Sequence, residues 1–268
     1  MMKIIKAILK ALGYEIVKFA SGVPASTHTF ANFTNVISAY EKLFQENQQF
    51  FFSANPSRTV LLARLRGTPP SEAYFIIKSL FQTKDVEGDI CEFGVAQGET
   101  SALIANEIRE SEKIFHLFDS FAGLSDPTTE DELKDDIFSL GSMNAYKGKM
   151  SYQKNWVLSR LDAVEFPQKR YSLHEGFIED VIAHEQNLPE KVAFAYVDFD
   201  LYAPIKTALE FLHTRTVKGA IIMIDDYDFF STGVKKAVDE FLQANVNYQI
   251  DVPSSDFGHF AILHKKQS

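Results

Sequence analysis

The stretch Gly88-Asp-Ile-Cys-Glu-Phe-Gly-Val-Ala-Gln-Gly-Glu-Thr-Ser101 decides the fold of this chain. In it, a short apolar run leads through two glycines into the start of an amphipathic helix. Glycine lets the backbone approach a ligand that a Cβ atom would push away, and the free N–H groups of a helix start point at the polar end of that ligand. The stretch therefore predicts a strand, a cofactor-binding loop and a helix. A tight strand-to-helix turn without a ligand is the alternative.

The glycine spacing favours one class of cofactor. A dinucleotide site needs G-x-G-x-x-G, whereas Gly98 follows Gly94 only after three other residues. Glu92, just ahead of the loop, would repel a phosphate. S-adenosylmethionine fits better, because it carries an ammonium and a sulfonium and no phosphate. The next strand-like run ends on Asp119, whose carboxylate can accept both hydroxyls of a ribose.

Strand-like and helix-like runs alternate after Asp89, which indicates an α/β fold. Strands buried on both faces and separated by helices imply a parallel sheet with helices on each side. The last residues predict an antiparallel hairpin at the edge of that sheet. The expected strands are 89–93, 114–118, 170–174, 192–197 and 220–224, followed by the hairpin 248–252 and 259–263; the expected later helices are 204–213 and 232–243.

Residues 1–84 read as helical and predict a cap or oligomerisation layer ahead of a cofactor-binding domain at 85–268. Before the last helix of this part, Thr68 suits a cap and Pro69 a first helical position. The basic amphipathic start, 1–19, suits either a membrane surface or, better, packing on the protein body or on a second subunit. We therefore expect a homo-oligomer.

Composition excludes several classes of protein. The 268 residues are 46% hydrophobic, enough for one large core, and carry a net charge of -9, which would repel a nucleic-acid backbone. Cys91 is the sole cysteine, so it has no internal disulfide partner, which fits a reducing compartment. No apolar run is long enough to span a bilayer, and the N-terminus lacks the pattern of a signal peptide. We expect a soluble, cytoplasmic protein.

Aspartates follow two neighbouring strands of the predicted sheet. Asp198 follows the fourth strand directly, with Asp200 beside it, and the pair Asp225 and Asp226 follows the fifth. The carboxyl ends of parallel strands meet at the ligand-binding edge, and carboxylates gathered there repel one another unless a cation holds them. Their oxygens suit Mg²⁺, which would acidify a hydroxyl so that a flanking carboxylate, Asp198 or Asp200, can act as the base. Helix caps or a solvated loop are the alternative.

Between residues 125 and 152 the periodicity disappears and acidic side chains gather. A long polar segment directly after the strand that ends on Asp119 suits a lid or an acceptor-binding loop. A solvated insertion without a role fits the same composition.

Five blocks together resemble the macrocin O-methyltransferase family. In the family's order, they are Asp89-Ile-Cys-Glu-Phe-Gly-Val-Ala-Gln-Gly-Glu-Thr-Ser101, Leu117-Phe-Asp-Ser-Phe-Ala-Gly-Leu124, Glu175-Gly-Phe-Ile-Glu-Asp180, Val197-Asp-Phe-Asp-Leu-Tyr202 and Ile224-Asp-Asp-Tyr227. The resemblance implies the class I methyltransferase (Rossmann-like) fold, with seven strands of which the last is antiparallel. It also implies S-adenosylmethionine and Mg²⁺ as cofactors, and a sugar hydroxyl of a glycan or glycosylated metabolite as the acceptor.

By position, the resemblance also implies roles for individual residues. It places Asp198, Asp225 and Asp226 as metal ligands, with Asp198 as the catalytic residue. The implied cofactor-binding residues are Thr68, Ser71, Glu92, Gly94, Gly98, Ser101, Asp119, Gly176 and Phe177.

The chain departs from the family pattern after Val95. The family usually has Trp-Arg-Gly-Gly there, whereas this chain has Ala96-Gln97-Gly98-Glu99, so a basic residue near the cofactor carboxylate is missing. Two other functions fit the same residues: methylation of a phenol or catechol, and a non-catalytic binding role on the same fold.

Overall fold

The computed structural model describes residues 58–266, so the expectations for residues 1–57 lie outside the described part. Its helices are α3 (Arg58–Leu62), α4 (Pro70–Gln82), α5 (Glu99–Glu107), α6 (Lys154–Ala163), α7 (Ile178–His184), α8 (Tyr202–Arg215) and α9 (Thr232–Ala244), with short 3₁₀ turns η2 (Met143–Tyr146), η3 (Gln168–Arg170) and η4 (Ser255–Phe257). Its strands are β1 (Asp89–Phe93), β2 (Phe115–Asp119), β3 (Tyr171–Glu175), β4 (Val192–Val197), β5 (Thr216–Ile224), β6 (Tyr248–Asp251) and β7 (Ala261–Lys265).

The strands form one seven-stranded sheet in the order β3-β2-β1-β4-β5-β7-β6. Strands β1 to β5 pair in parallel, and β7 runs antiparallel to both of its neighbours, β5 and β6. The predicted class I methyltransferase sheet with an antiparallel last strand is therefore confirmed. The order reverses between β1 and β4, and ligands bind at such a switch point in open α/β sheets.

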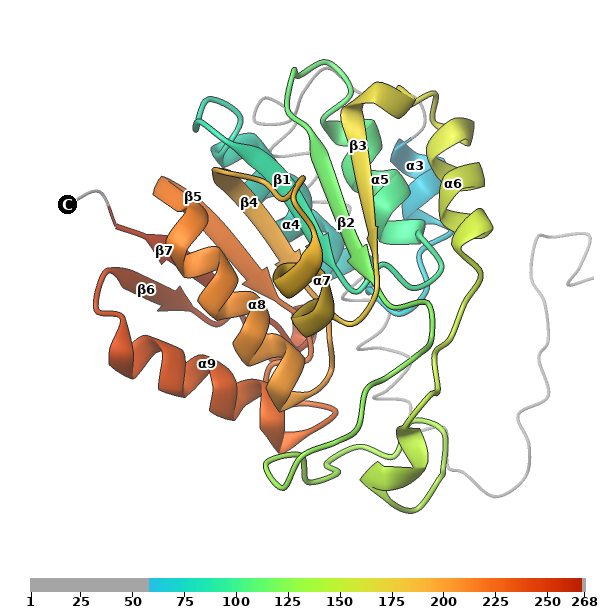
Figure 1. Ribbon diagram of the computed structural model, residues 1–268, viewed down its shortest axis with the longest axis vertical. Coiled ribbons are helices and arrows are strands. Elements are labelled where there is room, and N and C mark those ends of the chain that lie inside the picture. The colour runs from blue at the N-terminus through green and yellow to red at the C-terminus, as the bar shows by residue number, and fades with distance from the viewer. Residues whose placement is uncertain (1–57, 267–268) are drawn as a thin grey trace, which may run out of the picture.

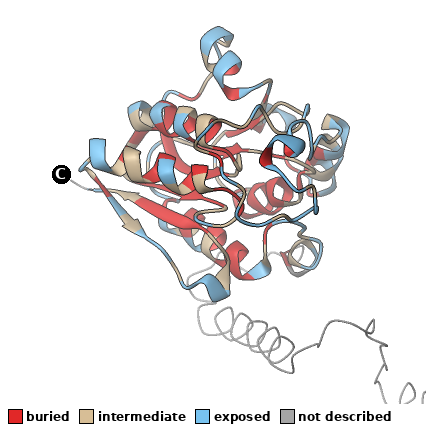
Figure 2. Ribbon diagram, turned by 90° about the horizontal axis from the view of Figure 1, so that it is seen from below, coloured by how far each residue is buried: buried red, intermediate tan, exposed pale blue. Residues whose placement is uncertain are grey.

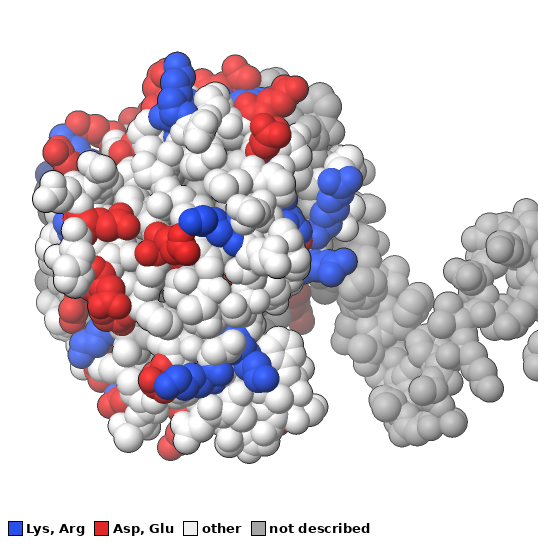
Figure 3. All heavy atoms as spheres, turned by 45° about the vertical axis from the view of Figure 1, so that its right-hand side comes forward, with Lys and Arg blue, Asp and Glu red and all other residues white. Residues whose placement is uncertain are grey.

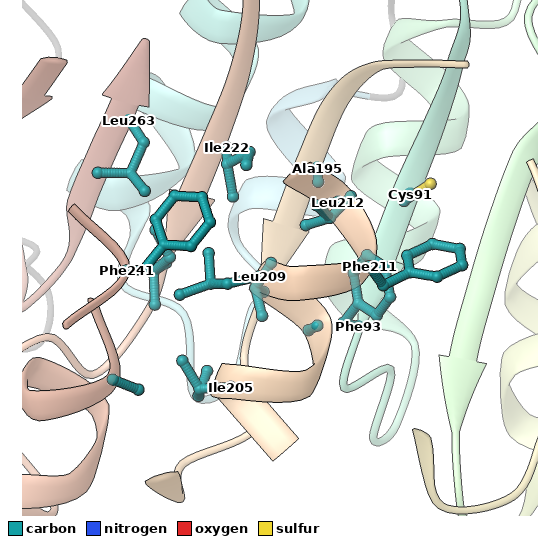
Figure 4. Close-up of a cluster of buried hydrophobic side chains, with 14 of the residues drawn as sticks. Cys91, Phe93, Ala195, Ile205, Leu209, Phe211, Leu212, Ile222, Phe241 and Leu263 are labelled. Atoms are coloured by element: carbon teal, nitrogen blue, oxygen red, sulfur yellow. The ribbon is translucent and has the colours of Figure 1, made fainter. Parts of the chain in front are cut away.

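Helices cover both faces of the sheet (Figure 1). On one face, α7, α8 and α9 pack on alternate strand residues such as Phe93, Ala195 and Ile222 (Figure 4). On the other, α4, α5 and α6 pack on the intervening residues, among them Phe194 and Met223. Successive strand residues point to opposite faces, so this division fills both layers with the continuous apolar runs of the sequence.

Burial is greatest in the central strands (Figure 2). All six residues of β4 are buried. Cys91 in β1 is also fully buried, and burial raises the pKa of its thiol well above the ordinary value. It therefore acts as a small apolar side chain and not as a nucleophile.

The end of the predicted N-terminal segment differs from expectation. Helix α4 begins at Pro70, with Pro69 as its N-cap. Thr68 does not cap it, because the Thr68 hydroxyl forms a hydrogen bond with that of Thr100 at 2.9 Å instead. Helix α4 packs into the same core cluster as α5 through Ile76 and Leu80. The domain boundary at residue 84 remains a prediction.

Strand β5 also begins at a different residue from the one that the sequence predicted. Strand β5 starts at residue 216 and not at 220, because its first residue, Thr216, already pairs with Val192 of β4. A hydrogen bond between the Thr216 and Tyr248 hydroxyls, 2.7 Å apart, holds this end against β6. The sequence pattern missed these residues because Gly219 interrupts the apolar run.

Two features of the described part bear on partners. No helix within residues 58–266 is long and apolar enough to cross a membrane. Acidic and basic side chains lie interspersed on the face drawn in Figure 3, which therefore presents no continuous basic surface of the kind that binds a phosphate backbone.

The long connection between β2 and α6, residues 120–153, lies beyond the carboxyl ends of the parallel strands (green in Figure 1). It has a small core of its own, in which Met143 and Tyr146 of η2 pack with Leu201 and Phe230. We call it the segment 120–153. Its place at this edge of the sheet makes it one wall of the site described next.

Candidate functional site

A cavity of about 450 Å³ opens at the carboxyl ends of β1, β2, β4 and β5. The loops that follow these strands line it together with the segment 120–153 and the residues just before α4. Its position is the switch point of the sheet, where an α/β fold is expected to bind its ligands.

Both glycines of the first loop are required by geometry. Gly94 has φ +86°, and a Cβ atom built on it would lie 1.7 Å from the carbonyl oxygen of Asp198. Gly98 has φ +83°, and its Cβ atom would lie 3.0 Å from the Cα atom of Val157. Any other residue at Gly94 would collide with the β4 loop, so this glycine brings the two loops together at the cavity.

Asp119 holds the glycine loop in place. Its Oδ2 atom accepts hydrogen bonds from the N–H groups of Val95 (2.7 Å) and Ala96 (2.8 Å), and its Oδ1 atom accepts one from Phe121 (2.6 Å). Burial raises the pKa of Asp119, while these three N–H groups lower it. A carboxylate offers about four acceptor positions, so Asp119, which also lines the cavity, retains acceptor capacity for a ligand.

Glu92 and Ser101 lie behind the loop without hydrogen-bond partners. Both side chains are fully buried, and neither the Glu92 carboxylate nor the Ser101 hydroxyl has a partner of acceptable geometry. Burial raises the pKa of Glu92 to about 8, an effect that the nearby Ser101 hydroxyl reduces and the charge of Asp119 increases. Buried polar atoms without partners are rare, and here they lie beside a ligand-sized cavity.

The other sequence-predicted cofactor residues fall into two groups. Thr68, Gly176 and Phe177 line the cavity, and Phe177 keeps 38% of its surface exposed there. Ser71 does not line it: this hydroxyl donates to the carbonyl oxygen of Phe257 at 2.7 Å, and so joins α4 to the turn before β7.

An acidic cluster forms the floor between the β4 and β5 loops. Oxygens of Asp198, Asp200 and Asp226 all lie within 4.8 Å of one another, close enough to share one metal ion. Asp200 and Asp226 adopt left-handed backbone angles, with φ +61° and +54°. Strained backbone of this kind is often found at functional sites.

The three aspartates are electrostatically unfavourable without a cation. Burial is the main cause that raises the pKa of each, and the charges of nearby carboxylates raise it further, although the Asp226 carboxyl lowers the pKa of Asp200 through a hydrogen bond. For Asp200 the pKa is raised to about 6. A divalent ion would offset this repulsion, and an all-oxygen set suits a hard cation such as Mg²⁺.

Asp225, implied as a metal ligand by the resemblance, has hydrogen-bond partners of its own. Its carboxylate accepts hydrogen bonds from the Tyr196 hydroxyl (2.6 Å) and from the backbone N–H of Asp226 (2.8 Å). It still lines the cavity, but the cluster uses Asp200 in its place. The sequence signal for Asp200 was its position two residues after Asp198, on the same loop.

Glu72 of α4 is a buried acid that the sequence analysis did not identify. Its Oε1 atom lies 3.1 Å from the Tyr196 hydroxyl, which also donates to Asp225. Burial, and then the charge of Asp225, raise the pKa of Glu72 well above the ordinary value. Glu72 falls on the buried face of α4, where its position looks like that of any core residue.

Comparison with known proteins identifies the family. Residues 76–266 match the family model described as macrocin-O-methyltransferase (TylF). The comparison with curated proteins returned no match.

Solved structures with the same fold include two O-methyltransferases. The O-methyltransferase NovP has a TM-score of 0.61 and 17% identity, and the match covers 74% of this chain and 81% of that one. The calicheamicin methyltransferase CalS11 has a TM-score of 0.55 and 22% identity, and the match covers 92% of this chain and 99% of that one. A further structure of CalS11 describes it as a TDP-rhamnose 3'-O-methyltransferase. The family match over most of the sequence shows that the chain belongs to the macrocin O-methyltransferase family and is an O-methyltransferase.

Proposed function

We propose that this protein transfers a methyl group from S-adenosylmethionine to a sugar hydroxyl of a glycan or glycosylated metabolite, with the help of Mg²⁺. One observation carries the proposal. The acidic cluster of Asp198, Asp200 and Asp226 lies on the wall of the same cavity as the glycine loop 94–98. A hard cation and a cofactor held in one cavity would bring an acidified hydroxyl and a methyl donor together.

The residues present fit S-adenosylmethionine. The glycine loop leaves space that a side chain would fill, and the orphaned Glu92 and Ser101 offer polar atoms under it. Asp119 would hold the ribose with its remaining acceptor capacity, and the exposed ring of Phe177 with Gly176 would border the adenine. When bound, the cofactor supplies an electrophilic methyl group.

The acidic cluster would hold the metal. Asp198, Asp200 and Asp226 offer it three carboxylates, and Asp225 adds a neighbouring negative charge. A bound divalent ion lowers the pKa of a coordinated hydroxyl by several units. We assign to Asp198 the role of accepting the hydroxyl proton, because it lies in the cluster and its backbone also contacts the glycine loop at Gly94.

The segment 120–153 supplies the acceptor side of the cavity. Ile137 and Phe138 line the cavity and remain 42% and 48% exposed. The turn that carries them is fixed, because the Asp136 carboxylate accepts hydrogen bonds from the N–H groups of Leu140 (2.7 Å) and Gly141 (2.8 Å). A rigid wall of this kind selects the acceptor while the glycine loop holds the cofactor.

A panel of acceptors tests this function. We expect methyl transfer to glycosides in the presence of Mg²⁺, and a loss of at least about a hundredfold in kcat when EDTA is added or when Asp226 is changed to Asn. Asp228→Asn, which alters an exposed acid outside the cavity, serves as the matched control and should retain activity.

Three results would change the assignment. Full activity in EDTA would remove the metal from the mechanism. Transfer to phenols or catechols alone would replace the sugar acceptor. Absence of S-adenosylmethionine binding in calorimetry with Mg²⁺ present would favour the non-catalytic role.

The organisation of the chain is a further part of the proposal. We propose that residues 1–84 form an oligomerisation layer, and that the domain at 85–268 works in the cytoplasm on small-molecule or glycan acceptors without nucleic acid. Light scattering of the full chain and of a chain that starts at residue 58 tests the first point. The same number of subunits in both would exclude residues 1–57 from the interface between subunits.

A further inference from the structure

The charges around the cavity are unequal. Among its described lining residues, Arg66 is the one Lys or Arg side chain. Seven lining residues are acidic: Glu99, Asp119, Glu179, Asp198, Asp200, Asp225 and Asp226. Such a wall repels anionic groups everywhere except near Arg66.

Arg66 is available for a ligand. Its side chain is exposed, and among residues 58–266 no carboxylate lies within ion-pair distance of it. The other arginine near the loop, Arg160, is already paired with Glu99 at 2.6 Å. Arg66 is therefore the free cation on the described cavity wall.

The position of Arg66 is fixed next to the start of α5. Two residues later, the Thr68 hydroxyl forms its hydrogen bond with the hydroxyl of Thr100, in the first turn of that helix. The glycine loop ends at Gly98, the N-cap of the same helix. A helix start carries free N–H groups and a partial positive charge, which add to the charge of Arg66 on this side of the cavity.

We propose that Arg66 binds the carboxylate of the amino-acid end of S-adenosylmethionine, an inference that rests on the proposed cofactor. That carboxylate is the one anionic group of the molecule, and Arg66 is the cation that the lining offers it. Arg66 thus provides, from the residues before α4, the positive charge that Ala96 and Gln97 do not provide from the loop. A guanidinium can bind a carboxylate through two parallel hydrogen bonds.

Calorimetry with two ligands tests the assignment. S-adenosylhomocysteine keeps the carboxylate, whereas 5′-methylthioadenosine lacks the whole amino-acid end. For Arg66→Gln we expect the Kd of S-adenosylhomocysteine to rise about three- to tenfold, as for a partly exposed charged hydrogen bond. The Kd of 5′-methylthioadenosine should not change. Arg66→Lys should recover part of the loss, because Lys keeps the charge without the two-pronged geometry.

Arg64→Gln is the matched control. Arg64 is also exposed, lies two residues away and does not line the cavity, so its removal should leave both Kd values unchanged. Salt gives a second readout: added NaCl should weaken the binding of S-adenosylhomocysteine to the natural chain more than to the Arg66→Gln variant.

The outcomes separate this inference from the proposed function. An unchanged Kd for S-adenosylhomocysteine in Arg66→Gln would overturn the role of Arg66 and leave the cofactor intact. An equal loss for both ligands would also overturn it, since the effect would then lie in the shape of the cavity. Failure of the natural chain to bind either ligand would overturn the proposed cofactor together with the inference.

Discussion

The two walls of the cavity are built in different ways. On the proposed cofactor side, the loop 94–98 takes its shape from glycines and from backbone N–H groups that donate to Asp119. On the proposed acceptor side, the segment 120–153 takes its shape from carboxylates that accept hydrogen bonds from backbone N–H groups, within the segment for Asp136 and from α8 for Asp131. Backbone geometry leaves a pattern in the sequence, whereas single side-chain contacts do not.

Asp131 shows how the acceptor side is held. It is 6% exposed, and its Oδ2 atom accepts from the N–H group (2.8 Å) and the hydroxyl (3.0 Å) of Thr128. Its Oδ1 atom accepts from the N–H group of Tyr202, at the start of α8, at 2.8 Å. A Cβ atom on Gly233 would lie 1.9 Å from that same oxygen. One carboxylate therefore joins the segment to α8 and α9.

The largest difference between the two walls is expected when one glycine is changed to alanine in each of them. Gly94→Ala should lower the free energy of unfolding by more than about 4 kcal/mol and abolish cofactor binding, because the new Cβ atom would overlap the Asp198 carbonyl. Gly141→Ala is the matched control: its φ is +79°, but nothing lies within 4 Å of the added atom, so we expect only about 1 kcal/mol. Urea unfolding measures both. Equal losses of unfolding free energy in the two variants would show that the close approach of the loops at Gly94 and Asp198 does not contribute to stability.

The buried carboxyl of Glu92 should make the stability of the cofactor-side wall depend on pH. Its folded pKa of about 8 lies above the ordinary value, so its protonated form favours the folded state. That contribution is complete below about pH 4.5 and is lost as the pH rises toward 8. Glu92→Gln should therefore raise the Tm of the ligand-free protein at pH 8.5, by about 5 °C, and much less at pH 5.5.

The same variant has an opposite effect on binding. Because the amide introduced by Glu92→Gln cannot carry the negative charge that attracts the ammonium of the cofactor, calorimetry should show weaker binding of S-adenosylhomocysteine at pH 8.5. A Tm gain that is equal at the two pH values would contradict the buried, raised pKa.

The smallest effect is expected on the acceptor side. Asp131→Asn keeps the shape and loses part of the acceptor capacity, so the free energy of unfolding should fall by about 1–2 kcal/mol. The KM for the acceptor should rise, while the Kd of S-adenosylhomocysteine stays constant. Asp135→Asn, at an exposed position of the same segment, is the control and should change neither. A loss of cofactor affinity in Asp131→Asn would show that the two walls are not independent.

The different construction of the two cavity walls also explains which features could be predicted from the sequence and which could not. Periodicity and the glycine loop indicated the sheet, its antiparallel last strand and the loop that meets Asp119, because each depends on local backbone preference. For residues 125–152, the sequence predicted a lid or an acceptor-binding loop, with a solvated insertion as the alternative, and it gave no internal structure. Asp131 and Asp136 were visible there as acids, but nothing local distinguishes an acid that accepts hydrogen bonds from backbone N–H groups from a solvated one.

The membership of the acidic cluster was also only partly predictable from the sequence. The sequence placed Asp198, Asp225 and Asp226 at one edge of the sheet, and all of them line the cavity. Which of them faces the others depends on the hydroxyl of Tyr196, a residue inside an apolar strand. Asp200 has a left-handed backbone conformation, and its carboxylate lies in the cluster. The sequence alone does not show which aspartate adopts this conformation.

The contact of Glu72, Tyr196 and Asp225 has a consequence for the ligand-free protein. Burial raises the pKa of Glu72, Asp225 and Asp226 above the ordinary values, so each of these carboxyls holds a hydrogen ion more tightly than a free carboxyl does. The divalent ion that we propose for this site would compete with hydrogen ions for these carboxylates, so acidification should weaken its binding. The heat of metal binding measured by calorimetry should consequently depend on the ionisation enthalpy of the buffer that takes up the released hydrogen ions.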